Sequence, residues 1–286
     1  MKTLLLIDAN SLIHRAFHAL PPFKSPAGAP SGALYGLSSI LLKILKERRP
    51  DYIAAAFDRP EPTERRLEYV DYKATRPKTA DELVSQLIES HRLLKAFGVR
   101  VFDLPGFEAD DLLASLVSKF KKESDLRIIV FSGDLDLLQL VKDDLVVAET
   151  PQKGISQTVT YNEDAVKERF GLSPEKIPDY KGLMGEKSDN IPGVPGIGPK
   201  TASALINQFG SIENLYAELK DGLVEPKISL KLKDYESQAL LSKKLAKLRG
   251  DIPLELKLEE LKVSVSREAL KAYFQEMGFS SLINRL

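Results

Sequence analysis

Three short apolar runs of the sequence each end on an aspartate, at Asp8, Asp58 and Asp134. The runs do not alternate with polar residues, and this pattern is typical of buried parallel strands. Because ligands of open α/β sheets bind outside the carboxyl ends of the strands, we expect the three carboxylates to face one crevice. A single aspartate at a strand end is usually a turn former or a helix N-cap, but three in equivalent positions indicate a functional cluster.

Six more acidic side chains in downstream segments extend the predicted cluster. They are Glu108, Asp110, Asp111, Asp136, Glu186 and Asp189. Glu108 and Asp111 are three residues apart at the start of an amphipathic stretch, so they share one face of the predicted helix. An acidic first turn also interacts favourably with the helix dipole, which explains one or two of these residues but not the whole set. Clustered carboxylates repel one another, and their pKa values rise unless a cation neutralises them.

The carboxylate ligands favour Mg²⁺, with Mn²⁺ as a substitute. The chain has no cysteine and three histidines, so a zinc site of Cys and His side chains is not expected. Because Mg²⁺ takes only one or two direct carboxylates, this number of acids indicates two ions. Two ions roughly 3.5–4 Å apart stabilise the attacking and leaving oxygens of a phosphoryl displacement. The acids alone do not identify the substrate.

The composition is that of an ordinary soluble globular protein, with 43% hydrophobic and 29% charged residues in a chain of 286. The 41 basic and 41 acidic residues balance, so nucleic-acid binding would require local basic patches. We find no signal peptide and no apolar stretch of about 18 residues, so we expect no membrane association. The absence of cysteine excludes a disulfide framework and fits a cytoplasmic location.

Residues 1–161 alternate short apolar runs with amphipathic stretches, and residues 162–286 show no further strand pattern. The alternation is typical of an α/β fold with a mostly parallel sheet flanked by helices. We predict strands at 3–8, 53–57, 99–102, 127–131 and 145–148, and helices at 32–47, 81–97 and 109–122. We predict that the second part is a helical domain, in which Asn162 caps a helix through Phe170 that Gly171 ends.

The segment 59–79 is rich in basic, aromatic and proline residues. Its position after a predicted catalytic strand indicates a mobile loop. Aromatic side chains among basic ones suit stacking on bases and pairing with phosphates. The candidates for DNA contact in this segment are Arg65, Tyr72, Lys73 and Arg76. The alternative is a solvated surface, because four acidic residues dilute the positive charge.

The stretch 195–202 has the form of a helix-hairpin-helix turn, which predicts a second DNA contact. Its candidate residues are Gly196, Gly198, Lys200 and Thr201. The glycines allow close approach of the backbone, and the N-terminus of the following helix favours a phosphate. The alternative is a tight turn between two helices. Residues 220–250 add a modest basic excess beside it, with eight basic residues named against four acidic ones.

Taken together, these motifs resemble the 5′→3′ exonuclease domain of bacterial DNA polymerase I, within the flap-endonuclease superfamily. The resemblance runs essentially end to end and rests on residues 6–12, 15–20, 56–58, 72–76, 108–114, 132–140 and 182–198, including Glu108-Ala-Asp-Asp-Leu-Leu-Ala and Gly182-Leu-Met-Gly. It implies a PIN-like nuclease core and a metal site formed by the nine acids. It also implies that Arg15, Tyr72, Lys73 and Arg76 grip the scissile phosphate or the 5′ end, and that the hairpin holds the downstream duplex.

The chain departs from the family pattern most clearly at Glu186, where the family usually has Asp. Glutamate keeps the charge but is one methylene longer, so an ion or its waters must shift. Smaller departures are Ala9 in place of a usual Gly, Leu135 in place of a frequent basic residue, and Pro199 in the hairpin. Proline is acceptable at the first helical position because its missing N–H would be unpaired there.

We therefore interpret the chain as a metal-dependent, structure-selective 5′→3′ exonuclease or 5′-flap endonuclease. The expected catalytic residues are Lys73, Arg76, Asp8, Asp58 and Asp111. The expected partners are DNA with 5′ ends, flaps or nicks, and a DNA polymerase domain in cis or in trans. A non-catalytic module that binds branched DNA is the alternative, with Glu186 as its main support. A small-substrate Mg²⁺ enzyme is a third hypothesis, which leaves the hairpin unexplained. The preference for RNA or DNA stays open, as does exonuclease against flap cutting.

Overall fold

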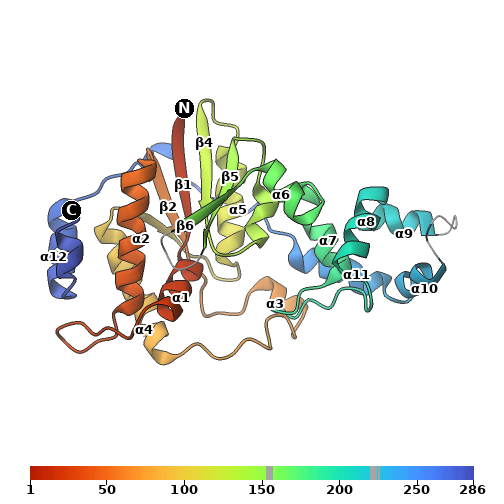
Figure 1. Ribbon diagram of the computed structural model, residues 1–286, viewed down its shortest axis with the longest axis horizontal. Coiled ribbons are helices and arrows are strands. Elements are labelled where there is room, and N and C mark those ends of the chain that lie inside the picture. The colour runs from red at the N-terminus through yellow and green to blue at the C-terminus, as the bar shows by residue number, and fades with distance from the viewer. Residues whose placement is uncertain (153–156, 220–223, 225) are drawn as a thin grey trace.

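A computed structural model describes residues 1–152, 157–219, 224 and 226–286 of the chain. Its centre is a six-stranded sheet in the order β3-β2-β1-β4-β5-β6. The strands are β1 (Lys2–Asp8), β2 (Tyr52–Ala56), β3 (Arg100–Phe102), β4 (Leu126–Phe131), β5 (Val146–Gln152) and β6 (Gln157–Tyr161). Neighbouring strands are parallel except β5 and β6, which are antiparallel. The predicted α/β class is therefore confirmed (Figure 1).

All five predicted strands are present, and β6 is the one that sequence reasoning missed. Its sequence Gln157–Tyr161 is mostly polar and only partly buried, as suits a strand at the sheet edge. β5 also extends further than predicted, to Gln152, because it pairs with β6 along residues 148–152. An edge strand buries little apolar area, so its sequence carries a weak signal.

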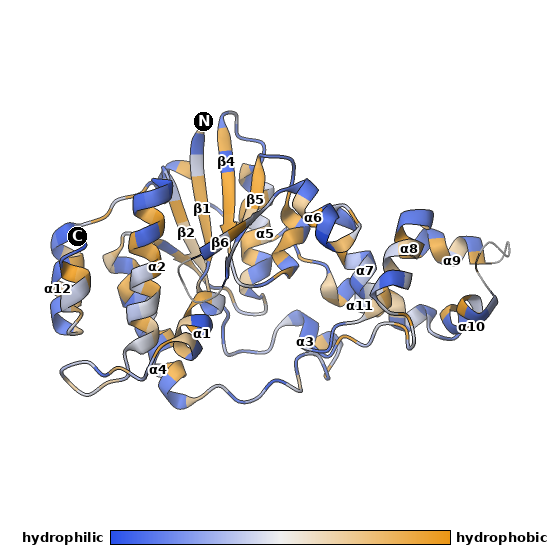
Figure 2. Ribbon diagram, in the orientation of Figure 1, coloured by the Kyte–Doolittle hydropathy of each residue, from blue (hydrophilic) through white to orange (hydrophobic). Residues whose placement is uncertain are grey.

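Helices cover both faces of the sheet, because the strands bury side chains on both sides. Leu5 and Ile7 face the core under α1 (Ala9–Ala19), α2 (Gly32–Arg48) and α4 (Asp81–Ala96), whereas Leu4 and Leu6 face α5 (Ala109–Phe120). The colouring of Figure 2 shows the resulting apolar strands between amphipathic helices. The helices predicted at 32–47, 81–97 and 109–122 thus exist within two residues of their expected ends.

The order of the strands reverses at β1, and this reversal determines where the predicted acidic crevice lies. The chain runs outward from β1 through β2 to β3, and α5 then returns it to β4 on the other side of β1. Such a switch point leaves a crevice at the carboxyl ends of the two central strands.

A helical unit follows the sheet and forms the opposite end of the molecule (Figure 1). It contains α6 (Glu163–Phe170), α7 (Ile177–Met184), α8 (Pro199–Phe209), α9 (Ile212–Glu218), α10 (Pro226–Asp234) and α11 (Glu236–Ala246). Asn162 caps α6 through its side chain, and Gly171 ends the helix in the left-handed conformation, as predicted. Five residues of the predicted basic stretch, 220–223 and 225, lie outside the described residues, and they include Lys220, Asp221 and Glu225.

The last part of the chain returns to the sheet. Ile252 and Leu261 join the core beneath α5, and Leu270 and Phe274 of α12 (Arg267–Glu276) join the core beside α4. The short helix α13 (Ser280–Ile283) completes the chain on the same side. The predicted boundary at residue 161 stays a prediction, but the packing assigns the end of the chain to the sheet core. Among the described residues, no helix is long and apolar enough to cross a membrane.

Candidate active site

Three strand ends bring Asp8, Asp58 and Asp134 to one crevice. Asp8 is the last residue of β1, Asp58 lies two residues after β2, and Asp134 three residues after β4. The crevice has a volume of about 260 Å³ and is lined by Asp8, Asn10, Ser11, His14, Asp58, Lys73, Arg76, Ala109, Asp110, Gly133 and Asp134. The arrangement that the sequence predicts for the strand-end acids is therefore present, and Asp110 joins them from α5.

Hydrogen bonds fix the orientation of these carboxylates. Asp8 caps α1 by accepting a hydrogen bond from the Ser11 amide at 3.0 Å, and it accepts another from Ser132 Oγ at 2.5 Å. Asp58 accepts a hydrogen bond from the Ala109 amide at 2.7 Å, at the start of α5. The capping role and the functional role of a strand-end aspartate are thus compatible, since the cap holds the carboxylate at the crevice.

The crevice raises the pKa values of its acids. Burial raises the pKa of Asp8 to about 7, and the charges of Asp58 and Asp134 add to the shift. Burial also raises the pKa of Asp110 well above its ordinary value, with Asp134 and Asp8 as further causes. The pKa of Asp134 is raised mainly by burial as well. A cation in this crevice would relieve both the burial cost and the mutual repulsion of the carboxylates.

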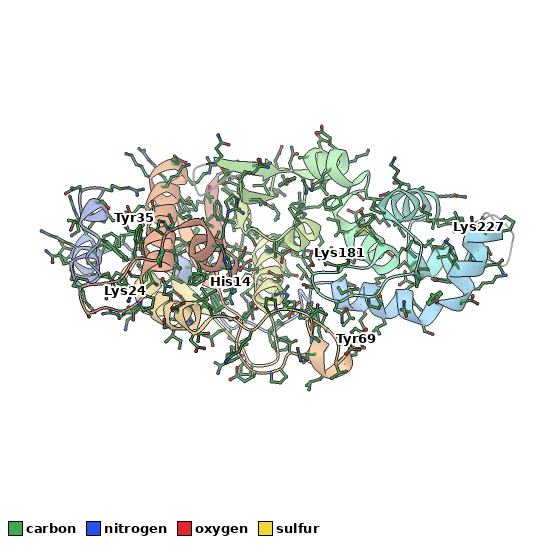
Figure 3. All side chains as sticks on the ribbon, turned by 60° about the horizontal axis from the view of Figure 1, so that its bottom comes forward. His14, Lys24, Tyr35, Tyr69, Lys181 and Lys227 are labelled. Atoms are coloured by element: carbon green, nitrogen blue, oxygen red, sulfur yellow. The ribbon has the colours of Figure 1, made fainter. Side chains whose placement is uncertain are left out.

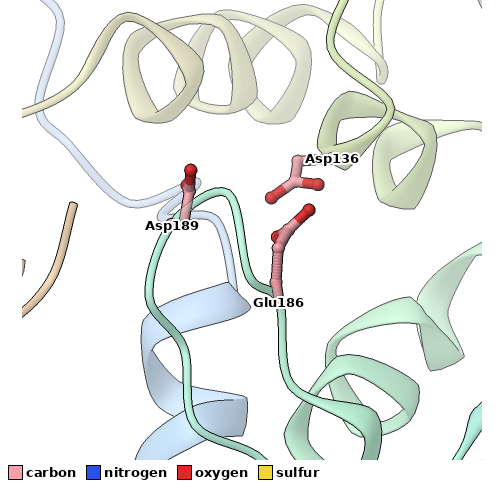
Figure 4. A group of neighbouring side chains, drawn as sticks. All are labelled: Asp136, Glu186 and Asp189. Atoms are coloured by element: carbon pink, nitrogen blue, oxygen red, sulfur yellow. The ribbon is translucent and has the colours of Figure 1, made fainter. Parts of the chain in front are cut away.

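A second group of acids consists of Asp136, Glu186 and Asp189. One carboxylate oxygen of each lies within 4.8 Å of those of the other two, as Figure 4 illustrates. Asp136 begins a 3₁₀ turn after β4, whereas Glu186 and Asp189 belong to a tight turn after α7. The helical unit therefore supplies part of the acidic cluster.

The acidic turn is closed by two backbone hydrogen bonds and by a close backbone approach that requires glycine. Glu186 and Ile191 exchange two backbone hydrogen bonds of 2.8 and 2.9 Å. Gly193 has φ 60°, and a Cβ at this residue would lie 2.2 Å from the amide nitrogen of Gly185. The close approach of these two glycines therefore fixes the turn that carries Glu186 and Asp189.

Three cationic side chains lie among the acids. Lys73 Nζ donates to Glu108 Oε1 at 2.7 Å, and Arg76 Nη2 donates to Asp189 Oδ1 at 2.5 Å. Lys181 donates to Asp136 and, at 2.5 Å, to Glu186. Although burial opposes it, the Glu108 carboxylate holds the pKa of Lys73 above its ordinary value. All three side chains therefore place positive charge beside the carboxylates.

Sequence reasoning missed Lys181. The residue is only 6% exposed and lies between the sheet part and the helical unit, as Figure 3 shows. Its signal was a lysine in the mostly apolar helix Ile177–Met184, directly before the acidic turn. A charged residue on a buried helix needs a partner of opposite charge, and Glu186 five residues later is one.

The loop that carries Lys73 is tied to the acidic turn. The Lys73 amide donates to the Asp189 carbonyl at 2.8 Å, and the Asn190 side chain donates to the Asp71 carbonyl at 2.8 Å. Lys73 has φ 54°, a strained conformation for a residue with a side chain. The strain lies beside the acidic cluster, where this fold holds its functional groups.

The structure gives three of the predicted site residues partners inside the protein. Arg65, predicted to contact DNA, is 9% exposed and has all its guanidinium N–H groups bonded inside the protein. Asp111, predicted as a metal ligand and catalytic residue, is 2% exposed and directs both oxygens to Arg65. Tyr72 was expected to grip the substrate, but it is 4% exposed and its hydroxyl donates to Glu108 at 3.0 Å. None of the three is among the residues that line the crevice, and their predicted roles stay predictions.

Arg15 and the hairpin occupy other positions. Arg15 is half-buried on α1. Gly196 has φ 80°, Gly198 is the N-cap of α8, and Lys200 is exposed in its first turn, next to the half-buried Thr201. Figure 1 shows α8 in the helical unit, away from α1 and the sheet, so the hairpin is a second surface and not part of the crevice.

The residues of the cluster fit a hard divalent cation. The two acidic groups offer carboxylate oxygens, and burial together with neighbouring carboxylates raises the pKa values of Asp8 and Asp110, which a bound cation would offset. Carboxylate ligands suit Mg²⁺ and Mn²⁺, whereas a zinc site would use Cys or His side chains. A switch-point crevice of this kind, joined to a helical unit with a glycine hairpin, agrees with the nuclease architecture expected from the sequence.

Two family models cover most of the chain. The model described as "5'-3' exonuclease, N-terminal resolvase-like domain" matches residues 3–171, and "5'-3' exonuclease, C-terminal SAM fold" matches residues 172–269. The chain belongs to the 5′-3′ exonuclease family. The two models meet ten residues after the boundary that the sequence predicted at 161.

Individual relatives agree with the family. A 5′-3′ exonuclease of Aquifex aeolicus (strain VF5) is 38% identical over 288 residues, which cover 100% of this chain and 96% of the relative. DNA polymerase I of Bacillus subtilis (strain 168) is 42% identical over 286 residues, which cover 100% of this chain and 32% of the polymerase. The chain thus spans about a third of the polymerases that it matches. T5 5′-exonuclease with bound divalent metal ions (zinc) shares the fold, with a TM-score of 0.70 at 22% identity over 97% of this chain and 99% of that one.

Proposed function

We propose that this protein is a Mg²⁺-dependent, structure-selective nuclease that hydrolyses DNA phosphodiesters at or near 5′ ends, flaps and nicks. The observation that carries the proposal is the meeting of four acids, Asp8, Asp58, Asp110 and Asp134, in one crevice of about 260 Å³. The second group, Asp136, Glu186 and Asp189, extends the acidic surface. Membership of the 5′-3′ exonuclease family supports the reaction class.

The two acidic groups are the residues that would hold two Mg²⁺ ions, with Mn²⁺ as a substitute. When bound, such ions lower the pKa of a water molecule and offset the charge that develops on the oxygens of a phosphate. The protein contributes fixed orientation: the hydrogen bonds from Ser11, Ser132 and Ala109 hold Asp8 and Asp58 in place before any ligand arrives.

Lys73 and Arg76 supply positive charge to the phosphate. Each is now bonded to a carboxylate, at Glu108 and Asp189 respectively, which keeps its charge at the mouth of the crevice. With the acids neutralised, the ammonium and guanidinium groups would be available to the phosphate oxygens. Arg76 is well placed for this exchange because its side chain is 47% exposed.

The hairpin before α8 provides a second contact with the DNA backbone. Gly198 leaves the first amides of α8 without a side-chain cap, and Lys200 adds an exposed positive charge in the first turn. These groups recognise phosphate and not base identity. We therefore expect selectivity for the shape of the substrate with little dependence on sequence.

Glu186 is compatible with activity. Its carboxylate accepts a hydrogen bond from Lys181 and lies with Asp136 and Asp189 in one group, so the extra methylene does not remove it from the cluster. Mg²⁺ keeps several waters, and these absorb small differences in ligand length. The alternative is a branched-DNA-binding module without cleavage. The ion pair of Glu186 with Lys181 favours this binding module. The cleavage experiment below distinguishes the binding module from the nuclease.

Cleavage of defined DNA substrates tests the proposal. Native protein is incubated with a 5′-flap, a nicked duplex, a blunt duplex and single-stranded DNA, each with Mg²⁺, Mn²⁺ or EDTA. We expect metal-dependent products from the flap and the nick, weaker cleavage of the blunt duplex, and none with EDTA. Tight binding of the flap without cleavage in either metal would refute nuclease activity and establish the binding module.

The DNA polymerase I relatives raise a proposal about partners. Since the chain matches about a third of those proteins, a polymerase domain in cis or in trans is expected to produce the flaps that this nuclease removes. A flap-processing assay with and without an added bacterial polymerase tests whether the two activities cooperate.

A further inference from the structure

Arg65 makes a complete set of hydrogen bonds in the interior of the protein. It lies on the five-residue helix α3 (Glu64–Glu68), and its side chain is 10% exposed. Its Nε donates to the Leu245 carbonyl and its Nη2 to the Lys247 carbonyl, both at 2.9 Å. The same fork donates to Asp111 twice at 2.6 Å and to Glu108 at 2.9 Å. No N–H group of this guanidinium is left for a phosphate.

The acceptors come from two distant parts of the chain. Glu108 and Asp111 begin α5, on the sheet side, whereas Leu245 and Lys247 lie at the end of α11, where the last helical carbonyls have no partner within the helix. A cation near the carboxyl end of a helix also interacts favourably with the helix dipole. Arg65 therefore joins the start of α5 to the end of α11.

Glu108 is held by three donors that divide its two oxygens. Oε2 accepts from Arg65 at 2.9 Å and from the Tyr72 hydroxyl at 3.0 Å. Oε1 accepts from Lys73, the cation at the edge of the acidic crevice. The Arg65 contact thus leaves one oxygen of Glu108 directed toward the crevice side.

Asp111 serves as the counter-ion of this arginine. Each of its oxygens takes one arm of the fork, and Oδ1 also accepts from the Arg249 amide at 2.8 Å. A paired, buried arginine is costly to separate from its carboxylate, so the position of Arg65 depends on Asp111. Lysine cannot reproduce this geometry, because an ammonium is a point charge without a planar fork.

The α11 contacts extend the effect of Arg65 to the second acidic group. α11 packs against α7, and the acidic turn that carries Glu186 and Asp189 follows α7 directly. A guanidinium that fixes the end of α11 to the start of α5 therefore also sets the distance between the two groups of acids.

We infer that Arg65, oriented by Asp111, is a positioning residue that fixes Glu108 and couples the helical unit to the metal-binding crevice. This inference rests on the proposed function for its catalytic consequence, but not for its effect on cation binding. Arg65 and Asp111 touch neither substrate nor cation. Their contribution is the alignment of the acids that do.

The test compares Arg65→Lys, Asp111→Asn and the double variant with native protein. Mn²⁺ binding without DNA is measured by electron paramagnetic resonance, and single-turnover cleavage of a 5′-flap and DNA affinity against salt are measured separately. Since partners of metal ligands typically change affinity or rate by about 10–100-fold, we expect each single variant to lose about tenfold or more in rate and several-fold in Mn²⁺ affinity. DNA affinity and its salt slope should stay unchanged. The double variant should be no worse than the poorer single variant, because the two residues act as a pair.

Arg249→Lys is the matched control. Arg249 is an arginine at the same junction, but its side chain bonds the exposed acids Glu64 and Asp251. We expect this variant to bind Mn²⁺ and to cleave as native protein does.

Three results would overturn the inference. A fall in DNA affinity and in the salt slope of about one counterion for Arg65→Lys, with Mn²⁺ binding intact, would make Arg65 a phosphate contact. Loss of Mn²⁺ binding in Asp111→Asn alone would make Asp111 a ligand. Additive losses in the double variant would show that the two residues act independently.

The design separates this inference from the proposed function. If native protein binds Mn²⁺ but cleaves no DNA, the proposed function fails, whereas the Mn²⁺ comparison still decides the role of Arg65. If Arg65→Lys does not fold, as judged by circular dichroism, Arg65→Gln takes its place in the comparison, and Mn²⁺ binding equal to that of Arg249→Lys would refute the inference.

Discussion

Replacement of Asp8 by asparagine should stabilise the metal-free protein in a pH-dependent way. Burial raises the pKa of Asp8 to about 7 from an ordinary value of 3.8. The native state therefore holds a proton over this pH range that the unfolded state releases, so the Asp8 carboxyl lowers the free energy of unfolding as pH rises from 3.8 to about 7. The penalty is complete above that range and absent below it. Asparagine carries no charge and avoids it.

The size of the effect follows from the shift. Between about pH 5.5 and about pH 8, the penalty grows over about 1.5 pKa units, which corresponds to about 2 kcal/mol at about 1.36 kcal/mol per unit. The change in hydrogen bonding to Ser11 and Ser132 is nearly the same at both pH values, so it cancels in this difference. We expect Asp8→Asn to gain about 2 kcal/mol more, relative to native protein, at the higher pH.

Urea unfolding in EDTA at the two pH values measures this difference. Saturating Mg²⁺ should remove the advantage of Asp8→Asn, because a cation restores the charged form of the native cluster. Asp144→Asn serves as the control, since Asp144 is exposed in a turn and is not among the residues that line the crevice. A stability difference between Asp8→Asn and native protein that is the same at both pH values would refute the account of the crevice electrostatics.

Four further predictions concern the cluster and the hairpin. Millimolar Mg²⁺ should raise the unfolding midpoint, by mass action on the native state, and a midpoint that does not move across a Mg²⁺ titration would argue against a formed metal site. Lys73→Ala should lower the single-turnover rate by about 100-fold. DNA affinity should change little, because the binding free energy is spread over many phosphate contacts and Lys73 would supply only one of them. Equal losses in rate and affinity would show that Lys73 is only a phosphate contact. Lys200→Ala should weaken duplex binding and lower the slope of log affinity against log salt by about one, whereas an unchanged slope would exclude a backbone contact. Glu186→Asp should change cleavage little and Glu186→Ala should reduce it strongly across a Mg²⁺ titration; an inactive native protein rescued by Glu186→Asp would instead support the binding module.

The strand-end acids were predictable because burial and position coincide. A parallel strand buried on both faces produces a continuous apolar run, and the next polar residue must lie at the carboxyl end of the sheet. Asp8, Asp58 and Asp134 therefore reveal both the strands and the crevice. The same logic fails for β6, whose half-exposed edge position leaves a polar sequence without a clear period.

Side-chain partners were less predictable than positions. Arg65 and Lys73 lie in one basic segment, but the first is saturated by carboxylates and carbonyls, whereas the second lies at the crevice. Sequence spacing cannot tell them apart, because the acceptors at Leu245 and Lys247 are about 180 residues away. The sequence also does not show that Asp111 pairs with Arg65, whereas its neighbour Asp110 lines the crevice. Asp111 was therefore assigned to the metal together with Asp110.

Long-range packing also explains the return of the chain end. The apolar positions of α12 predict an amphipathic helix, but they do not say which surface it covers. In the structure Leu270 and Phe274 pack into the core of the sheet domain. Along the sequence, the helical unit is therefore inserted between two segments that share this core. The fold class and the acids were thus predictable, while the partner of each buried charge was not.

Cleavage of a 5′-flap at saturating Mg²⁺, by native protein and by Asp134→Asn, decides whether the acidic crevice is the active site. Asp134 lines the crevice, and its carboxylate is one of the acids that would hold the ions. We expect native protein to cleave the flap near its base, and Asp134→Asn to lose about 100-fold or more of the rate while it binds the flap with similar affinity. Equal cleavage rates for the two proteins would contradict the assignment of the crevice as the active site.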